Sequence, residues 1–391
     1  MPWKEVDLMD ERVEFMGRLI EGERMTDLCR EFGITRKTGY KFLERYHKFG
    51  VEGLNNQSRR PCHLARKTGD ETEQMIIRLK GLYPTWGPKK LRARLETLHP
   101  GVNFPVTSTI GEILDRHGLV KNRKRQRAQE KLYPTRMSES SACNEVWCTD
   151  FKGQFRLGNQ SYCYPLTVTD HFSRYLIGCE ALTTTKTSPS IAVFEQLFDH
   201  YGLPVAIKSD NGVPFSSQSF AGLSELSAWW MSLGIQPQRS RPGHPQDNGR
   251  HERMHRTLKA EATRPAGQNQ LQQQERFDDF REGYNRERPH EALEMKTPNS
   301  LYTASKRTLA EAQKELTYSM HDYIRKISPG GCLKLNGQNC FLGSAMRGHQ
   351  VGVRELGDGL HLISLGPFDL GYMSLKTKKF TIDNPLTPQE E

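Results

Sequence analysis

The sequence predicts a multidomain protein with all-α helix-turn-helix domains at its N-terminal end, an α/β core and a small C-terminal β-barrel. Its 391 residues are more than one ordinary hydrophobic core requires. Apolar residues recur at helical spacing in the first third of the chain, whereas short β-branched runs follow and then alternate with helical stretches. The end of the chain is rich in glycine between short apolar runs, which is typical of a small β-barrel or sandwich. We expect a helix-turn-helix domain at 1–54, a second helical domain at 62–120, a basic linker at 121–142, the core at 143–305 and the barrel at 318–382.

The composition is that of a water-soluble protein with a basic surface. Apolar residues make up 35% of the chain, and no apolar run approaches the ~20 residues that a membrane helix needs. The N-terminus lacks the apolar segment of a signal peptide, so we expect a cytoplasmic protein without a membrane partner. The eight cysteines form no Cys-x-x-Cys pair, which speaks against a cysteine zinc site. The net charge of +10 suits a polyanionic partner, although a basic surface can also serve solubility alone.

The N-terminal segment has helix-turn-helix punctuation. Thr26 can cap a short helix, Gly33 can supply the turn, and Thr35 can cap a second helix that runs to about Phe49. The early face of that second helix can meet a major groove and its phosphates, as recognition helices do. The alternative is a three-helix bundle with a solvated face. The candidate DNA-binding residues on this face are Arg36, Lys37 and Lys41.

Two further segments carry clustered positive charge. The second helical domain contains "GPKKLRARLETL", whose Lys89 and Lys90 suggest another DNA-binding module or, nearly as well, a solvated helix face. The following stretch, "KNRKRQRAQEKLYPTR", is too basic to form a core, and we expect it to lie along a phosphate backbone. Its candidate DNA-binding residues are Arg123, Lys124, Arg125 and Arg127.

Three carboxylates of the α/β segment stand at informative positions. Asp150 lies in or at the end of the first strand, Asp210 ends the strand "PVAIKSD", and Glu252 lies near the start of a helix. Acids at the carboxyl ends of strands project into a crevice, where Asp150 and Asp210 can share an ion. Carboxylate ligands suit Mg²⁺, and two such ions would clamp the oxygens of a displacement at phosphorus. Taken singly, each acid has a plainer explanation as a turn or helix-start residue.

The stretches around these acids occur in a recognisable order: "VWCTDFKG", "YPLTVTDHFSRYLIG", "IKSDNGVPF", "RPGHPQDNGRHERMHRTLK" and "YNRERPHEAL…TPNSLY". In this order they resemble the DDE transposases of bacterial insertion sequences, which are relatives of retroviral integrase. The resemblance implies a ribonuclease-H-like core in which Asp150, Asp210 and Glu252 bind two Mg²⁺ ions, with Mn²⁺ able to replace them. It also implies that the helix after Glu252 contacts the element's end. The basic residues of that helix are Arg253, Arg256 and Lys259.

The function that follows is DNA transposition. The protein would bind terminal inverted repeats through its helix-turn-helix domain, cut to expose 3′-hydroxyls and transfer them to target DNA by two-metal phosphoryl transfer. Two paired ends imply a homodimer or a higher oligomer, working on the bacterial nucleoid. Two alternatives remain open: a domesticated DNA-binding regulator with a non-catalytic core, and a nuclease of the same fold.

The segment "HERMH" also matches the zinc-protease pattern H-E-x-x-H, formed by His251, Glu252 and His255, with Glu275 as a possible third ligand. The arginines around the motif would oppose metal loading, whereas a phosphate backbone would favour them. On a helix Glu252 shares a stripe with Arg256 and Lys259, and the histidines form a neighbouring stripe. We therefore interpret the histidines as packed or DNA-contacting residues, and Asp170 as either a structural acid or a residue that supports the metal ligands.

Overall fold

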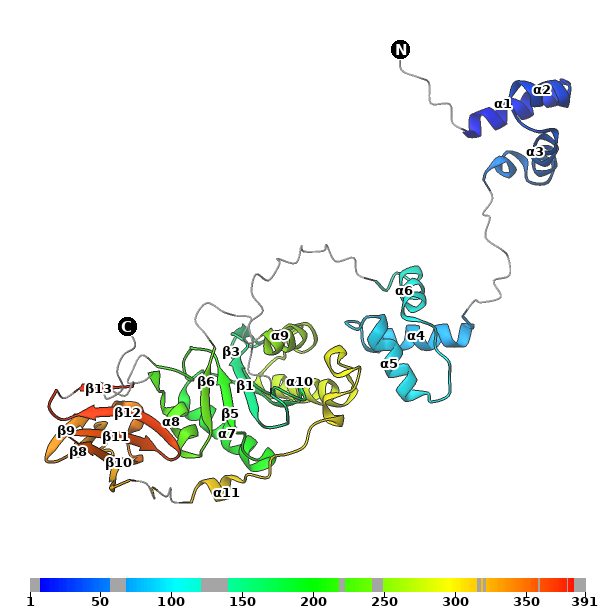
Figure 1. Ribbon diagram of the computed structural model, residues 1–391. Coiled ribbons are helices and arrows are strands. Elements are labelled where there is room, and N and C mark those ends of the chain that lie inside the picture. Colours follow the sequence, from blue (N-terminus) through cyan, green and yellow to red (C-terminus); the bar gives the residue numbers. More distant parts are fainter. Residues whose placement is uncertain are drawn as a thin grey trace, which may run out of the picture. The chain divides into compact units, whose positions relative to one another are not determined.

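The computed structural model (Figure 1) describes most of the chain, and its described residues are 8–56, 68–120, 140–217, 222–240, 249–314, 318, 321–357, 359–377 and 379–382. They belong to two compact units, Met1–Thr68 and Gly69–Glu391. Within the described residues, no helix is both long and apolar enough to cross a bilayer. Arg123, Lys124, Arg125 and Arg127 of the predicted basic linker lie outside them, so their DNA contacts stay a prediction.

The first unit contains α1 (Leu8–Ile20), α2 (Met25–Glu31), α3 (Arg36–Phe49) and a 3-10 turn at Gly50–Leu54. Gly33 supplies the turn with a φ of 63°, and the Thr35 side chain caps α3 by accepting a hydrogen bond from Thr38 N, as predicted. The predicted cap at Thr26 is wrong because this residue lies inside α2. Arg24 occupies the cap position instead and makes no side-chain cap.

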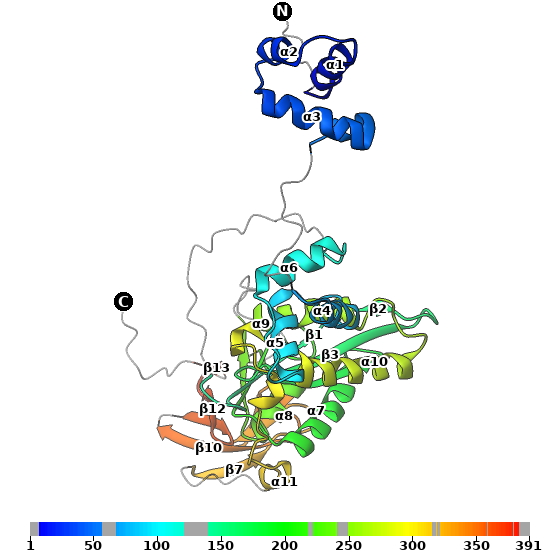
Figure 2. The same cartoon turned by 90° about the vertical axis from the view of Figure 1, so that its right-hand side faces the viewer.

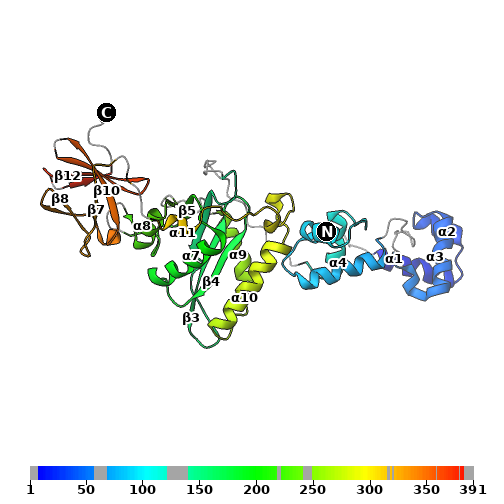
Figure 3. The same cartoon turned by 90° about the horizontal axis from the view of Figure 1, so that it is seen from below.

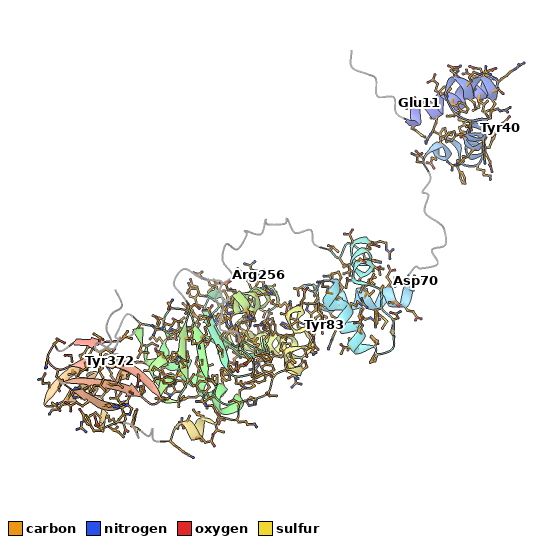
Figure 4. All side chains as sticks on the ribbon, viewed as in Figure 1. Glu11, Tyr40, Asp70, Tyr83, Arg256 and Tyr372 are labelled. Carbon is orange, nitrogen blue, oxygen red and sulfur yellow. The ribbon has the colours of Figure 1, made fainter. Side chains whose placement is uncertain are left out.

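Gly39 lets α3 lie close against α2. A Cβ atom at this position would stand 2.6 Å from Met25 Sδ and 2.8 Å from Cys29 Sγ, which is too near for any side chain. The buried face of α3 therefore faces the helix before it, and the opposite face with Tyr40 is exposed (Figure 4). The exposed residues of this face include Arg36, Lys37 and Lys41.

The second unit begins with three helices, α4 (Asp70–Leu82), α5 (Pro88–Leu98) and α6 (Thr107–Arg116). Proline stands at the first position of α5, where its missing N–H costs nothing. The three helices enclose a core of their own that includes Ile76, Leu91 and Ile110. The helical module expected from the apolar spacing is therefore present.

The α/β core is built on one mixed sheet, whose strands are β1 (Val146–Phe151), β2 (Phe155–Arg156), β3 (Tyr162–Asp170), β4 (Leu176–Leu182), β5 (Ala206–Ser209) and β6 (Gln236–Arg239). The order across the sheet is β4-β3-β1-β5-β6, with β2 also paired to β3. β1, β3 and β4 are antiparallel neighbours, whereas β5 and β6 run parallel to β1. This topology fits the expected ribonuclease-H-like core.

Helices cover both faces of this sheet. α7 (Thr187–Tyr201) and α8 (Glu225–Ser232) pack on the face of β1 that carries Trp147, in a core with Phe194 and Trp230. α9 (Gly249–Glu261) and α10 (Gln270–Glu282) pack on the other face, and Figure 3 shows α10 beside β4. Successive residues of a strand point to opposite faces, so β1 presents Cys148 and Asp150 to the side of α9.

After α10 the chain continues through a π-turn at Gly283–Glu287, two 3-10 turns at Glu291–Leu293 and Pro298–Ser300, and α11 (Leu309–Ala312). The C-terminal strands follow: β7 (Tyr323–Lys326), β8 (Cys332–Leu335), β9 (Gln338–Phe341), β10 (Gln350–Gly357), β11 (Leu360–Leu365), β12 (Phe368–Ser374) and β13 (Lys379–Thr381). All strand pairs among them are antiparallel.

The closed C-terminal barrel that we expected is wrong for the strands that the structure describes. They form an open five-stranded sheet in the order β13-β12-β11-β10-β7 and a separate β8-β9 hairpin (Figure 1), and Figure 2 shows β7, β10, β12 and β13 from another side. The apolar side chains of this sheet share one core with the hairpin and with Ala228 and Met231 of α8. Because the hairpin and α8 cover the apolar face, the sheet buries it without closing on itself.

Candidate active site

Strand register brings two of the three predicted acids side by side. In the parallel pair of β1 and β5, Cys148 lies opposite Lys208. Continuing that register by two residues along each strand brings Asp150 next to Asp210, which directly follows β5. Alternation along β1 points the Asp150 carboxylate to the side of α9, and Asp210 directly follows the neighbouring strand.

α9 brings the third acid to the same side of the sheet. Glu252 stands in its first turn and is exposed, as are Arg256 and Lys259. The opposite stripe of the helix is buried against the sheet and contains His251, Met254, His255 and Leu258. The two stripes predicted from helical spacing are therefore confirmed, and Figure 4 shows Arg256 on α9.

The three carboxylates act on one another electrostatically. Burial raises the pKa of the Asp150 carboxyl to about 7, with the charge of Asp210 as the next cause and that of Glu252 as a smaller one. A divalent cation would relieve this repulsion between like charges. Three carboxylates form a hard oxygen donor set, which fits Mg²⁺ or Mn²⁺ better than a soft metal.

The side chains themselves do not form a tight chelate in this conformation. In the described part of the chain, no three His, Cys, Asp or Glu side chains come close enough together to hold a metal ion. Asp210 Oδ1 accepts a hydrogen bond from Gly212 N at 3.1 Å, so its carboxylate is turned toward its own loop. The backbone thus gathers the three residues, and the side chains of Asp210 and Glu252 are exposed.

The histidines of the H-E-x-x-H motif are buried polar residues of the core. His251 Nε2 and His255 Nε2 lie 2.8 and 2.7 Å from Thr167 Oγ1, and His251 Nδ1 lies 2.9 Å from Thr169 Oγ1. Burial lowers the pKa of His251 to about 3 and that of His255 further still. These ring nitrogens, which a zinc ion would need as ligands, are therefore already hydrogen-bonded to threonine hydroxyls. The possible third zinc ligand, Glu275, is exposed on α10.

Asp170 makes the contacts of a structural acid, which is the first of the two roles expected for it. Its side chain is 1% exposed and accepts hydrogen bonds from Asn144 N at 2.8 Å, Ser173 N at 2.7 Å and Ser173 Oγ at 2.6 Å. These bonds hold the tight connection between β3 and β4. Both oxygens of the carboxylate are therefore engaged in these bonds.

Sequence reasoning missed several basic residues near the acids. Arg174, Arg250 and Arg288 line a cleft together with Glu252 and Arg253. The pKa of Lys152 is lowered by burial and by the charge of Lys259, so these two ammonium groups lie in the same neighbourhood. One signal was available, because Lys152 stands two residues after Asp150 and so points to the same face of β1 if the strand continues. Arg174 and Arg288 lie in two of the stretches that carry the resemblance, but no role was predicted for either residue.

The predicted DNA-binding residues that the structure describes are exposed, except Lys90, which is half-buried. Arg253 is exposed on α9 beside Arg256 and Lys259. Lys89 of α5 forms an ion pair with Glu291 Oε1 at 2.5 Å, and 61% of its side chain remains exposed. Burial and the nearby Arg288 guanidinium lower the pKa of Lys90 to about 8. DNA contacts of these residues stay predictions.

Four family models match this chain. Two models described as integrase core domains match residues 140–245 and 233–298. A helix-turn-helix domain model matches residues 11–61, and a homeodomain-like domain model matches residues 38–114. The helix-turn-helix match indicates DNA binding, and integrase cores belong to polynucleotidyl transferases as a family.

Proteins of insertion elements are similar over most of their length. The chain is 26% identical over 291 residues to the uncharacterised 39.2 kDa protein of insertion element IS476 from Xanthomonas euvesicatoria, an alignment that covers 74% of this chain and 81% of the relative. It is 25% identical over 281 residues to the uncharacterised 31.7 kDa protein of IS407 from Burkholderia multivorans, covering 67% and 95% respectively.

Among solved structures, the HTLV-2 integrase catalytic core domain in complex with magnesium is similar with 18% identity and a TM-score of 0.34, covering 42% of this chain and all of that one. A score of this size supports no further conclusion. The domain matches and the insertion-element relatives are the stronger findings. Together they place the chain in the integrase superfamily, as a transposase of the insertion-element kind.

Proposed function

We propose that this protein binds the terminal inverted repeats of its element, cuts the DNA to expose 3′-hydroxyls and transfers them to target DNA. The observation that carries the proposal is the parallel register of β1 and β5, which brings Asp150 beside Asp210 on the face where α9 presents Glu252. Both steps are displacements at phosphorus without a covalent enzyme intermediate, so the protein has to supply position and charge.

We propose that Asp150, Asp210 and Glu252 hold two Mg²⁺ ions, which Mn²⁺ can replace. When bound, such ions would make the attacking oxygen more nucleophilic and stabilise the leaving oxygen. Asp150, the most buried of the three acids, would be the fixed ligand. Arg253, Arg256 and Lys259 would neutralise backbone phosphates along the exposed stripe of α9 and align the DNA with the acids.

The exposed face of α3 would recognise the terminal repeats through Arg36, Lys37 and Lys41. Two ends must be held together for paired-end chemistry, so we propose a homodimer or a higher oligomer as the active form. Its place of work would be the nucleoid in the bacterial cytoplasm, because its substrate is chromosomal and element DNA.

A cleavage and joining assay tests the proposal against its two rivals. The protein is incubated with labelled element ends, unlabelled target DNA and Mg²⁺, and the products are separated on denaturing gels. We expect nicked ends with free 3′-hydroxyls and longer products in which these ends are joined to target. Binding alone would indicate a regulator with a non-catalytic core, and nicking without joined product would indicate a nuclease.

Magnesium should stabilise the protein more strongly at higher pH. Since the pKa of Asp150 is raised to about 7, the folded protein keeps a proton that the unfolded chain has already released, and its metal-free stability falls as pH rises from about 4 toward 7. Mg²⁺ binds the ionised carboxylate, so we expect 10 mM Mg²⁺ to raise the melting temperature more at pH 8 than at pH 6. At about 100 times the dissociation constant the gain would be about 2.7 kcal/mol.

Scanning calorimetry of the second unit's transition measures this effect. The Asp150→Asn variant should lose the pH dependence of the magnesium shift. Glu195→Gln serves as a matched control, because Glu195 is exposed on α7 over the other face of the sheet. A magnesium shift of equal size at both pH values would contradict metal binding by the ionised Asp150.

A further inference from the structure

The two histidines beneath Asp150 have no part in the function proposed so far. Both lie on the sheet-facing stripe of α9 and are almost fully buried, with His251 1% and His255 6% exposed. Buried polar groups are rare unless they are hydrogen-bonded, and an aliphatic residue would fill this space without any such need. Both rings are hydrogen-bonded within the core.

The contacts form a continuous chain that ends at Asp150. Thr169 Oγ1 contacts His251 Nδ1, His251 Nε2 contacts Thr167 Oγ1, and Thr167 Oγ1 contacts His255 Nε2, at 2.9, 2.8 and 2.7 Å. His255 Nδ1 then lies 3.7 Å from Asp150 Oδ2. Register explains the alignment, because β3 pairs Thr167 directly with Asp150 and Thr169 with Cys148 of β1.

The single proton of the Thr167 hydroxyl decides which way this chain runs. The hydroxyl can accept two hydrogen bonds but can donate only one. It also lies 3.0 Å from the carbonyl oxygen of Asp150, an atom that can only accept. If the proton points to that carbonyl, both imidazoles donate to Thr167 through Nε2, and the bare Nδ1 of His255 faces the carboxylate of Asp150. Two lone pairs would then oppose each other whenever Asp150 is ionised.

If the Thr167 proton points to His255 Nε2 instead, every ring nitrogen has a suitable partner. Thr169 donates to His251 Nδ1, His251 Nε2 donates to Thr167, and Thr167 donates to His255 Nε2. The remaining proton of the neutral His255 then sits on Nδ1 and points at the carboxylate of Asp150. This arrangement gives up the hydrogen bond from Thr167 Oγ1 to the carbonyl oxygen of Asp150 and gains a contact between His255 Nδ1–H and the carboxylate, which an ionised Asp150 favours.

We propose that His255 is a positioning residue, whose Nδ1–H orients the ionised carboxylate of Asp150 and which is itself held in that tautomer by Thr167, His251 and Thr169. The inference rests on the proposed role of Asp150 as a metal ligand. The separation of 3.7 Å exceeds a hydrogen bond, and catalytic hydrogen bonds of this kind are often long without substrate and tighten when the site is loaded.

The expected consequence concerns metal affinity. A carboxylate ligand that is held by an outer hydrogen bond loses less freedom when it binds metal, and loss of such a partner typically weakens metal binding about 10–100-fold. Asp210 and Glu252 are exposed, whereas Asp150 is half-buried with His255 beside it, so Asp150 is the ligand for which an outer partner matters most. DNA-end binding by the first unit should be unaffected.

Two amide variants of His255 separate positioning from packing. The side-chain nitrogen of asparagine stands close to where imidazole Nδ1 stood, whereas that of glutamine reaches the place of Nε2. We expect His255→Asn to keep the half-saturating Mg²⁺ concentration of nicking within about 3-fold of wild type, and His255→Gln to raise it about 10–100-fold. If the two variants give the same half-saturating concentration, His255 only packs and the proposal is overturned.

A second pair of variants covers the case in which both changes at His255 impair folding. Thr167→Ser keeps the hydroxyl that fixes the tautomer, and Thr167→Val removes it at similar size. Binding of Mn²⁺ to the full-length protein without DNA is measured by electron paramagnetic resonance, which needs no activity. We expect Thr167→Val, but not Thr167→Ser, to weaken Mn²⁺ binding about 10-fold. Equal affinities in these two variants would also overturn the proposal.

The Asp150→Asn variant, measured alongside these variants, distinguishes the metal-ligand role of Asp150 from the positioning role of His255. If this variant still nicks DNA, the role of Asp150 as a metal ligand is wrong, and the proposed function has to be revised first. If it is inactive while His255→Asn and His255→Gln behave alike, the proposed function stands and only the positioning role is lost.

Discussion

Asp150→Asn is expected to lower both nicking and strand joining by at least about 1,000-fold, because residues that act together as one catalytic unit cannot replace one another. Asp150 is the least exposed member of the triad and the only one inside a strand, so no neighbouring backbone movement can bring a substitute ligand into its place. Asparagine keeps the size of the side chain and removes the charge. Rates are measured with labelled element ends at saturating Mg²⁺.

End binding must survive in the same variant for this result to identify chemistry rather than folding. Electrophoretic mobility shifts at fixed salt should give equal affinities for Asp150→Asn and wild type, because the recognition face lies in the first unit. Glu195→Gln, an exposed acid on the other side of the sheet, should leave cleavage unchanged. Retained cutting by Asp150→Asn would refute the assignment of the triad.

The second large effect is expected at the recognition helix. Replacing Arg36, Lys37 and Lys41 together by alanine should weaken binding of the terminal repeats about 100-fold at 0.15 M salt and make the slope of log affinity against log salt shallower by about 3. All three side chains are exposed on the early part of α3. Loss of three phosphate contacts would release correspondingly fewer counterions, which a salt titration of binding measures directly.

Lys48→Ala is the matched control for this triple variant. Lys48 lies near the end of the same helix and pairs with Glu44 at 2.7 Å, with more than half of each side chain exposed. Its removal deletes one positive charge without touching the proposed recognition face. A loss of affinity equal to one third of the triple variant's loss, on a logarithmic scale, would show that α3 acts through general charge and not through its early face.

Much of the fold was accessible from the sequence because its signals are local. Apolar spacing identified the helices of both N-terminal modules, and short β-branched and aromatic-rich runs identified β1, β3 and β4. Local reading failed where several residues compete for one role. Thr26 has a side chain that suits a helix cap. The cap position is nevertheless Arg24, whose backbone is extended, and α2 begins at Met25.

The C-terminal region shows a different limit. Short strands separated by glycines predict an antiparallel sheet, and that sheet is present. Whether it closes depends on what covers its apolar face, and here the cover includes Ala228 and Met231 from a helix roughly a hundred residues earlier in the chain, a separation of the long-range kind that no local pattern encodes. Closure was therefore wrongly expected from strand content alone.

The sequence by itself determined which residues carry charge, where strands and helices begin, and that Asp150, Asp210 and Glu252 stand at their ends or first turns. Only the tertiary structure decided that the strands leading to Asp150 and Asp210 pair in parallel, and that the histidines of the H-E-x-x-H motif turn inward to Thr167 and Thr169. The reason is physical: helix and strand periods act over a few residues, whereas register and packing join residues far apart in the chain. The H-E-x-x-H motif alone does not show which of its side chains are buried, because this depends on how α9 packs against the sheet.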